Sequence, residues 1–516
     1  MKKPIDYADI FRKDLVEFRE VTEKFYRGEV SVGDYKGFSG GFGTYAQRGA
    51  NQGMLRLRLY GGRIPKEHLN FIWESVEKYN IDLIHFTTCQ TIQLHDLDAI
   101  TICTLVEEAW DHGIMTRGGG GDYPRNIMMS PLSGTDKNEA FDLGPYVEAT
   151  SDYLLTFIDT VRLPRKLKVC FSNTPENYPH ATYRDLGFVA NENHTFDVYS
   201  AGGLGRSPML GVKVAENIDP ADILNYVRAM VDMFVTYGDY KNRGRARTRF
   251  IQEDLGPAGY QKEFLRFVAE AQKNYDLSFP ILFTPVEKMG PISDFVHKRA
   301  ISQKQTGLYS VYYHPPGGNL SRDILALLKQ KLSTYDSVEI RLTPDQGCYI
   351  INCTAKEAQE LIELTSDHSG TDFESSVACI GSRICQVGIS DSQGFLFDCL
   401  KAVEPYHFAN HVLPAIHISG CPSSCGTHQT AAMGFRGGVK QTPEGPRPAY
   451  AIYLNGSSLY GLETISPEHG LILASRIPDL LIELGTAITN ARCSFHPWVA
   501  AHKEEFLAIV ENYTAP

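Results

Sequence analysis

The sequence predicts an α+β protein made of two related halves, each a compact unit followed by a larger one. The first observation is an internal repeat. Residues 55–109 and 309–364 both show a strand, a Gly-Gly turn, an amphipathic helix, two alternating strands and a second helix. The second is an ordinary globular composition, 43% hydrophobic and 22% charged over 516 residues. A chain of this length holds about two to four domains.

The larger units also repeat. A strand that follows a helical stretch, a Gly-Phe strand and an aromatic strand that ends in glycine come in the same order in both halves. In pairs, these landmarks are residues 163–173 with 413–424, 187–190 with 434–437, and 196–205 with 450–459. Chance similarity between common α+β patterns is the alternative, but the shared order favours duplication. Duplication predicts a pseudo-twofold molecule with a site where the halves meet.

Composition and charge exclude several classes of protein. The net charge of −11 argues against a general nucleic-acid binder. Residues 1–20 lack the apolar core of a signal peptide, and no run of about 18 apolar residues predicts a membrane span. Eleven cysteines in such a chain favour a reducing, cytoplasmic setting, where clustered thiols more often bind metal or do redox work than form disulfides.

Four cysteines of the second half stand in two pairs. Five residues separate Cys379 from Cys385, and three separate Cys421 from Cys425. Thiolates from two loops can hold a cubane iron–sulfur cluster, and nearby glycines let the backbone approach a bulky cofactor. Pro422 is typical of the first position of a helix, which would aim backbone N–H groups at the sulfur of Cys425.

Spacing alone leaves three alternatives for these thiols. Zinc also takes four cysteines, although its knuckles use about two to four intervening residues. A disulfide is disfavoured in a reducing compartment. Cysteines are also often buried structural residues. We expect this structural role for four of the others: Cys103, Cys170, Cys399 and Cys493.

C-x5-C followed by G-C-P-x-S-C-G resembles the siroheme-containing sulfite and nitrite reductases, closest to the ferredoxin-type sulfite reductase branch. The resemblance covers nearly the whole chain and includes the duplication. It implies a [4Fe–4S] cluster on Cys379, Cys385, Cys421 and Cys425, with Cys425 also bridging to the siroheme iron. It implies three domains with both cofactors at their junction. The expected parts are an N-terminal extension (1–49), two ferredoxin-like half-domains that form domain 1 (50–118 and 305–372), a siroheme and substrate domain (119–304), and a domain that binds the cluster and siroheme (373–516).

Basic residues would complete the pocket, because siroheme carries carboxylates and the substrate is an anion. Lys166 and Lys168 lie two apart on a predicted strand and face one side, where an anion would relieve their repulsion. From the residues alone, solvated strand faces explain such stretches more often. The resemblance implies substrate contacts from Arg56, Arg125, Lys166 and Lys168. It also implies siroheme contacts from Arg56, Arg125, Arg247 and Arg249, the last two lying in residues 242–250, which would otherwise be an exposed edge strand.

The chain departs from the family pattern at one cation. Sulfite reductases of the family have an arginine in a "TxRQ" motif, where this chain reads "FTTCQTIQLH" with Cys89. We expect Arg117 or residues 242–250 to replace the missing charge. His428, in "CGTHQ", is either a donor near the sulfur atoms or a surface residue.

The resemblance implies the six-electron reduction of sulfite to sulfide, with nitrite reduction to ammonia as the alternative. Lys168 favours sulfite, because plant-type nitrite reductases have asparagine there and sulfite is largely a dianion. The chain has no ferredoxin-type cysteine run and no convincing dinucleotide motif. We therefore expect a ferredoxin or a reductase subunit to supply electrons. A non-catalytic zinc-binding protein is the remote alternative, and a siroheme protein made inactive by the change at Cys89 is another.

Overall fold

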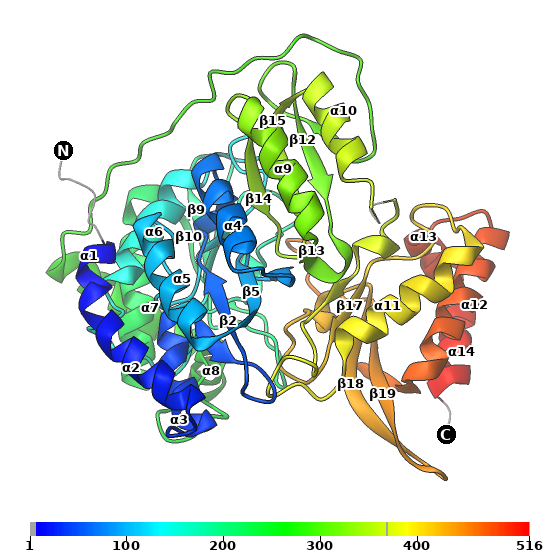
Figure 1. The fold of residues 1–516 in the computed structure, drawn as a ribbon, viewed down its shortest axis with the longest axis horizontal. Coiled ribbons are helices and arrows are strands. Elements are labelled where there is room, and N and C mark those ends of the chain that lie inside the picture. The colour runs from blue at the N-terminus through cyan, green and yellow to red at the C-terminus, as the bar shows by residue number, and fades with distance from the viewer. Residues whose placement is uncertain (1–6, 368–369, 515–516) are drawn as a thin grey trace.

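The computed structural model describes residues 7–367 and 370–514 (Figure 1). Its described part holds four five-stranded sheets with helices packed against them, which is the predicted α+β class. Two sheets belong to the compact units and two to the larger units. None of the described helices is long and apolar enough to cross a membrane.

The two compact units exchange one strand each. The strand order is β1-β2-β5-β4-β13 in the first sheet and β11-β12-β15-β14-β3 in the second. Strand β3 follows the first Gly-Gly turn but pairs with β14, and β13 follows the second such turn but pairs with β4. Each half therefore completes the sheet of the other. The strands are β1 (Thr44–Ala46), β2 (Gly53–Leu57), β3 (Arg63–Ile64), β4 (Ile84–Phe86), β5 (Ile92–Leu97), β11 (Ala300–Ser302), β12 (Leu308–Tyr313), β13 (Asn319–Leu320), β14 (Glu339–Leu342) and β15 (Cys348–Thr354).

Glycines permit this exchange. Gly62 and Gly318 have φ values of 70° and 78°, which L side chains rarely adopt. A Cβ atom at Gly62 would lie 2.8 Å from the carbonyl oxygen of Leu342 in the other half. One at Gly318 would lie 2.9 Å from the carbonyl oxygen of Phe86, again in the other half. The two Gly-Gly turns thus let each strand reach the opposite sheet.

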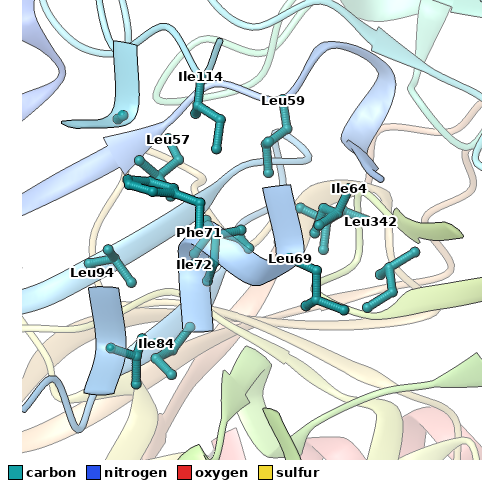
Figure 2. Packing of buried hydrophobic residues seen from close by; sticks show 14 of the residues in the cluster. Leu57, Leu59, Ile64, Leu69, Phe71, Ile72, Ile84, Leu94, Ile114 and Leu342 are labelled. Atoms are coloured by element: carbon teal, nitrogen blue, oxygen red, sulfur yellow. The ribbon is translucent and has the colours of Figure 1, made fainter. Parts of the chain in front are cut away.

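A shared core joins the compact units. The helices of these units are α4 (Lys66–Lys78), α5 (Ala99–Asp111), α9 (Arg322–Thr334) and α10 (Ala355–Leu364), and their apolar faces belong to one buried cluster. Figure 2 shows Ile64 and Leu69 of the first half close to Leu342 of the second. Helices α1 (Tyr7–Phe11) and α2 (Leu15–Tyr26) contribute Phe11 and Phe18 to the same cluster. The N-terminal residues therefore pack onto the first compact unit.

The larger units share one topology. The first sheet has the order β10-β9-β8-β7-β6 and the second β16-β17-β18-β19-β20. In both, the first three strands along the chain run parallel and the next two antiparallel. The strands are β6 (Met128–Met129), β7 (Val169–Ser172), β8 (Leu186–Ala190), β9 (Phe196–Ser200), β10 (Val212–Ile218), β16 (Val377–Ala378), β17 (Ile416–Ser419), β18 (Met433–Thr442), β19 (Gly445–Leu454) and β20 (Glu468–Leu473).

Separate helices cover the two larger sheets. The first unit has α6 (Gly144–Leu155), α7 (Ile223–Tyr237) and α8 (Thr248–Asn274), and the second has α11 (Ser392–Val403), α12 (Ile477–Asn490), α13 (Phe495–Ala501) and α14 (Lys503–Thr514). Each set encloses its own buried cluster. Residues 275–296, which contain no helix or strand, run from α8 toward β11 as the long trace at the top of Figure 1.

Glycines at matching places support the duplication. A Cβ atom at Gly187 of β8 would lie 1.9 Å from the carbonyl oxygen of Ala181, and one at Gly434 of β18 would lie 1.8 Å from that of His428. In both cases the blocking carbonyl comes six residues earlier in the chain. The same close contact between a strand glycine and a preceding carbonyl oxygen therefore occurs in both halves.

We expect Gly434→Ala to destabilise the protein by about 1–3 kcal/mol or more, because the neighbouring backbone cannot yield to a methyl group. The measurement is the melting temperature of the purified protein. Gly259→Ala in α8 is the matched control, since its Cβ would meet only Leu255 Cβ at 3.6 Å. Equal melting temperatures for the two variants would contradict the claim that the backbone around Gly434 leaves no room for a methyl group.

Candidate active site

A large cavity is lined by the first compact unit and both larger units. Its volume is about 1120 Å³. All the predicted site residues line it except Arg249. The wall takes residues from segments far apart in the chain: 45–47, 54–58, 85–95, 119–126, 158–168, 379–388 and 419–427.

The four predicted ligand cysteines reach this cavity because two neighbouring strands end there. Strands β16 and β17 pair in parallel, so their carboxyl ends share one edge of the sheet. Cys379 and Cys385 follow β16, and Cys421 and Cys425 follow β17. The strand order therefore unites two pairs that lie about forty residues apart in sequence.

The helix predicted to begin at Pro422 is wrong. Residues 421–427 form turns and irregular backbone, with Ser424 and Thr427 at φ values of 54° and 55°. These left-handed residues interrupt any helix. A backbone N–H group still reaches sulfur, since Gly420 N donates to Cys379 Sγ at 3.1 Å.

The thiols suit a metal cluster chemically. Cys425 opens onto the cavity, yet the surrounding protein desolvates its thiol and, with Cys379, raises its pKa to about 12, while Lys166 acts in the opposite direction. The four cysteines can therefore be thiolates together only when a positively charged group, such as a metal centre, binds them. Among the described residues, no three His, Cys, Asp or Glu side chains are grouped so that they could hold a single metal ion. Four thiols from two loops are the donor set of a [4Fe–4S] cluster.

Three of the predicted cations lie in the segments that lead into two neighbouring strands of the other larger sheet. Lys166 and Lys168 precede β7, and Arg125 precedes β6, which pairs in parallel with β7. Arg125 N donates to Leu167 O at 2.9 Å, and this hydrogen bond holds the two segments side by side. Arg56 comes from β2 of the first compact unit. The fold thus brings the four predicted substrate residues to one cavity.

Backbone carbonyls, rather than carboxylates, hold the two arginines. Arg56 Nη1 donates to Gly119 O at 2.6 Å, and Arg125 Nη1 donates to the same oxygen at 2.8 Å. Arg125 Nη2 donates to Gly121 O at 2.8 Å. Two guanidinium groups therefore donate to one carbonyl oxygen, and neither of them pairs with a carboxylate in the described part of the chain.

The positive charge of this wall has no carboxylate partner among the residues that the structure describes. Within the described ranges, Arg56, Arg125, Lys166 and Lys168 make no ion pair with Asp or Glu, because the nearby carboxylates Asp122 and Asp185 pair with other arginines. Burial and neighbouring cations lower the pKa of Lys166 well below its usual value. Buried charges are normally paired. The wall is therefore suited to an anionic ligand.

Lys168 has a sulfur neighbour. Its Nζ lies 3.3 Å from Cys89 Sγ. Although burial acts to raise it, the pKa of the Cys89 thiol is lowered to about 6 by Lys168, Arg184 and Arg56. The neighbouring cations thus favour the thiolate form of Cys89. The place where the family pattern has a cation holds an acidic thiol here.

The arginine-rich residues 242–250 do not form an edge strand. They form turns that lead into the first turn of α8. Arg247 lines the cavity and pairs with the buried Asp185 at 2.8 Å. Arg249 lies outside the cavity wall, with Nε and Nη1 buried and without hydrogen-bond partners, so its siroheme contact stays a prediction. Arg243 also lines the cavity and pairs there with Asp122, whereas Arg245 pairs with the surface carboxylate of Asp254.

Two further expectations are wrong. Arg117 does not replace the missing cation, because it pairs with Asp14 and Asp159 and is not part of the cavity wall. His428 is not a surface residue: it is fully buried, its Nδ1 lies 2.9 Å from Ser419 Oγ, and burial lowers its pKa to about 3. It is not part of the cavity wall either.

Sequence reasoning missed Arg184. This residue lines the cavity between the 3-10 turn Ala181–Tyr183 and β8. Its surroundings in the sequence, "TYRDLGF", carry no motif of charge or spacing. Only the fold places it near Lys168 and Cys89.

Two family models match this chain. The "Nitrite and sulphite reductase 4Fe-4S domain" matches residues 120–271, and the "Nitrite/Sulfite reductase ferredoxin-like half domain" matches residues 45–109 and 301–367. Together the matches cover more than half of the chain. The 4Fe-4S domain model matches the first larger unit, which does not hold the four cysteines. The second larger unit, which holds them, has the same sheet topology.

Curated relatives carry two kinds of name. Ferredoxin–nitrite reductase of Synechococcus elongatus is 27% identical over 84% of this chain and 85% of its own length. Chloroplastic ferredoxin–nitrite reductase of Arabidopsis thaliana is 27% identical over 78% of this chain and 70% of its own. Sulfite reductase [ferredoxin] of Mycobacterium tuberculosis is 25% identical over 74% of this chain and 69% of its own.

A solved structure has the same fold. The structure titled Mycobacterium tuberculosis NirA protein aligns over 98% of both chains with a TM-score of 0.78 and 21% sequence identity. The predicted duplicated architecture is therefore confirmed.

Proposed function

Because the chain belongs to the nitrite and sulfite reductase family, we propose that this oxidoreductase catalyses the six-electron reduction of sulfite to sulfide in the cavity described above. The observation that carries the proposal is the positive wall formed by Arg56, Arg125, Lys166 and Lys168, which has no carboxylate partner among the described residues. The second ammonium, Lys168, supports sulfite, because a dianion gains more than a monoanion from an added positive charge.

Family membership implies siroheme and a [4Fe–4S] cluster, and the residues fit both. Cys379, Cys385, Cys421 and Cys425 would hold the cluster. Arg56, Arg125 and Arg247 would face the siroheme carboxylates. The volume of about 1120 Å³ lies just above the usual range for ligand pockets, as a large cofactor requires. When bound, the two groups supply the electrons and the iron at which the anion reacts.

The side chains of the wall would do the remaining work. The ammonium groups of Lys166 and Lys168 hold the oxygen atoms of the anion and stabilise their charge. Burial lowers the pKa of both lysines, so each releases a proton more readily than a surface lysine. The protons allow the oxygens to leave as water. Arg56 and Arg125, fixed by Gly119 O, orient the anion.

The electron donor would be a small ferredoxin. Curated relatives on both the nitrite and the sulfite side carry ferredoxin in their names. Encounters of this kind are usually small and electrostatically steered. A cytoplasmic location stays a prediction, since one relative is chloroplastic.

Nitrite reduction to ammonia is the second candidate, and Cys89 favours it. Its thiolate, 3.3 Å from Lys168, offsets part of the charge on which the choice of sulfite rests. A wall with less positive charge suits the monoanion nitrite better than a dianion.

The test is an anaerobic absorption spectrum of the purified protein, followed by oxidation of reduced methyl viologen with sulfite and with nitrite. We expect siroheme bands and a higher kcat/KM for sulfite. Siroheme bands with nitrite preferred would overturn the choice of substrate but keep the cofactors. Siroheme bands without turnover would indicate an inactive siroheme protein, and a colourless protein with stoichiometric zinc would overturn the proposal entirely.

Lys168→Asn should lower the ratio of sulfite to nitrite kcat/KM by about tenfold or more, because it removes charge that favours the dianion. Steady-state kinetics with both anions measures the ratio. Lys401→Asn, on the exposed surface of α11, is the control that should leave it unchanged. If Lys168→Asn also leaves the ratio unchanged, Lys168 does not select the substrate.

A further inference from the structure

Arg184 is a buried cation with an unused donor. The residue is 7% exposed and lines the cavity. Its Nε donates to Pro179 O at 3.0 Å, whereas Nη2 is buried without a hydrogen-bond partner. Among the residues that the structure describes, no carboxylate forms an ion pair with it. A buried guanidinium in this state normally has an anionic partner.

The nearest carboxylate in sequence is committed elsewhere. Asp185 binds Arg247 Nη2 through both oxygens, at 3.0 and 2.8 Å. It also accepts hydrogen bonds from Thr248 Oγ1 and from Lys168 N. These contacts hold the carboxylate on the side of α8. Asp185 therefore cannot serve as the counterion of its neighbour.

The other groups that face Arg184 are not suitable partners. Burial raises the pKa of the Cys170 thiol to about 12 and that of the Tyr183 hydroxyl well above its usual value, and it keeps His180 neutral. Lys168 carries the same charge as Arg184. Cys89 is the one thiolate nearby, and its sulfur already lies 3.3 Å from Lys168 Nζ. None of these groups therefore gives the free Nη2 of Arg184 an anionic partner of its own.

We propose that Arg184 binds an oxyanion group inside the cavity, either a carboxylate of the tetrapyrrole or the oxyanion substrate. This inference rests on the proposed function. Arginine suits the role, because its planar fork binds carboxylates and oxyanions through two parallel hydrogen bonds. Arg184 thereby restores the positive charge that the family pattern has at the place of Cys89. The positive charge that replaces the family's arginine thus comes from the segment just before β8. Neither Arg117 nor residues 242–250 need supply it.

The test is Arg184→Gln, expressed with siroheme available and compared with the wild type. Siroheme per chain is measured from the absorption spectrum, and KM for sulfite and nitrite from steady-state turnover. We expect a fall of at least threefold in siroheme content, or a rise of about tenfold in KM at unchanged siroheme content. The first result identifies a tetrapyrrole carboxylate as the partner and the second identifies the substrate. Arg447→Gln, on the exposed β19 hairpin, is the matched control.

A rescue separates binding from general damage. Cys89→Arg in the Arg184→Gln background returns a guanidinium to the same part of the cavity and should recover at least half of the lost property. If Arg184→Gln does not fold, Arg184→Lys keeps the charge without the fork and should show a weaker loss of the same kind. The inference is overturned if the folded variant keeps siroheme content and both KM values within twofold of the wild type. Wild-type protein without siroheme would instead overturn the proposed function.

Discussion

Cys379→Ser should remove the iron–sulfur cluster and abolish anion reduction. Wild-type protein should hold about five iron atoms per chain, four in the cluster and one in siroheme. A serine hydroxyl is a much weaker ligand for cluster iron at neutral pH than a thiolate. The loss should exceed about a thousandfold in kcat, because every electron that reaches the substrate would pass through this cluster.

The geometry makes Cys379 the most informative of the four cysteines. Its sulfur accepts the Gly420 N–H at 3.1 Å and lies 3.1 Å from Ser392 Oγ, so a serine can keep the local hydrogen bonds. The polypeptide should therefore fold and lose metal rather than misfold. Iron analysis, the absorption spectrum and the melting temperature together measure this.

Cys493→Ser is the matched control. Cys493 is a partly exposed thiol packed on the core of the second larger unit and does not line the cavity. Its iron content and turnover should equal those of the wild type. An active Cys379→Ser variant with full iron content would show that the four cysteines were assigned wrongly.

The pattern of strands, turns and helices made the duplication predictable. The Gly-Gly turns and the pairing of 187–190 with 434–437 could be read from sequence because each reflects a local backbone requirement. The exchange of β3 and β13 between sheets could not, since both are two-residue strands without a pattern of their own. Strand exchange depends on contacts between residues more than two hundred positions apart.

Part of the candidate site could be predicted from the sequence, namely the residues that form a recognisable pattern along the chain. Four cysteines in two close pairs and two alternating lysines drew notice by their spacing, and the family resemblance then implied a role for each. Arg184 and the contact between Cys89 and Lys168 gave no such signal, because each depends on which loops meet at the cavity. Residues 242–250 left an edge strand open as the alternative, because their arginines alternate. The structure has turns there instead, and Arg243 and Arg245 pair with Asp122 and Asp254.

Lys166→Met should lower kcat/KM for the anionic substrate by about 100- to 1,000-fold. Lys166 is partly buried beside Lys168, Arg247, Arg125 and Cys425, and it has no carboxylate partner in the described ranges. Its ammonium group therefore serves a ligand rather than the fold. Steady-state kinetics at several anion concentrations separates the effect on kcat from that on KM.

Stability gives the independent check on this assignment. Burial and three neighbouring cations lower the pKa of Lys166, which means that its charged form is held at a cost in the folded protein. A neutral methionine of similar length should keep or raise the melting temperature while activity falls. A structural lysine would behave in the opposite way, because removing it would lower both stability and activity.

Lys166→Arg tests whether charge alone suffices. Arginine keeps the positive charge but does not release a proton near neutral pH. If Lys166 both binds the anion and donates protons, this variant should bind substrate with a KM near that of the wild type and still turn over about tenfold or more slowly. Wild-type turnover would limit the role of Lys166 to electrostatic binding and would leave Lys168 as the proton donor of the wall.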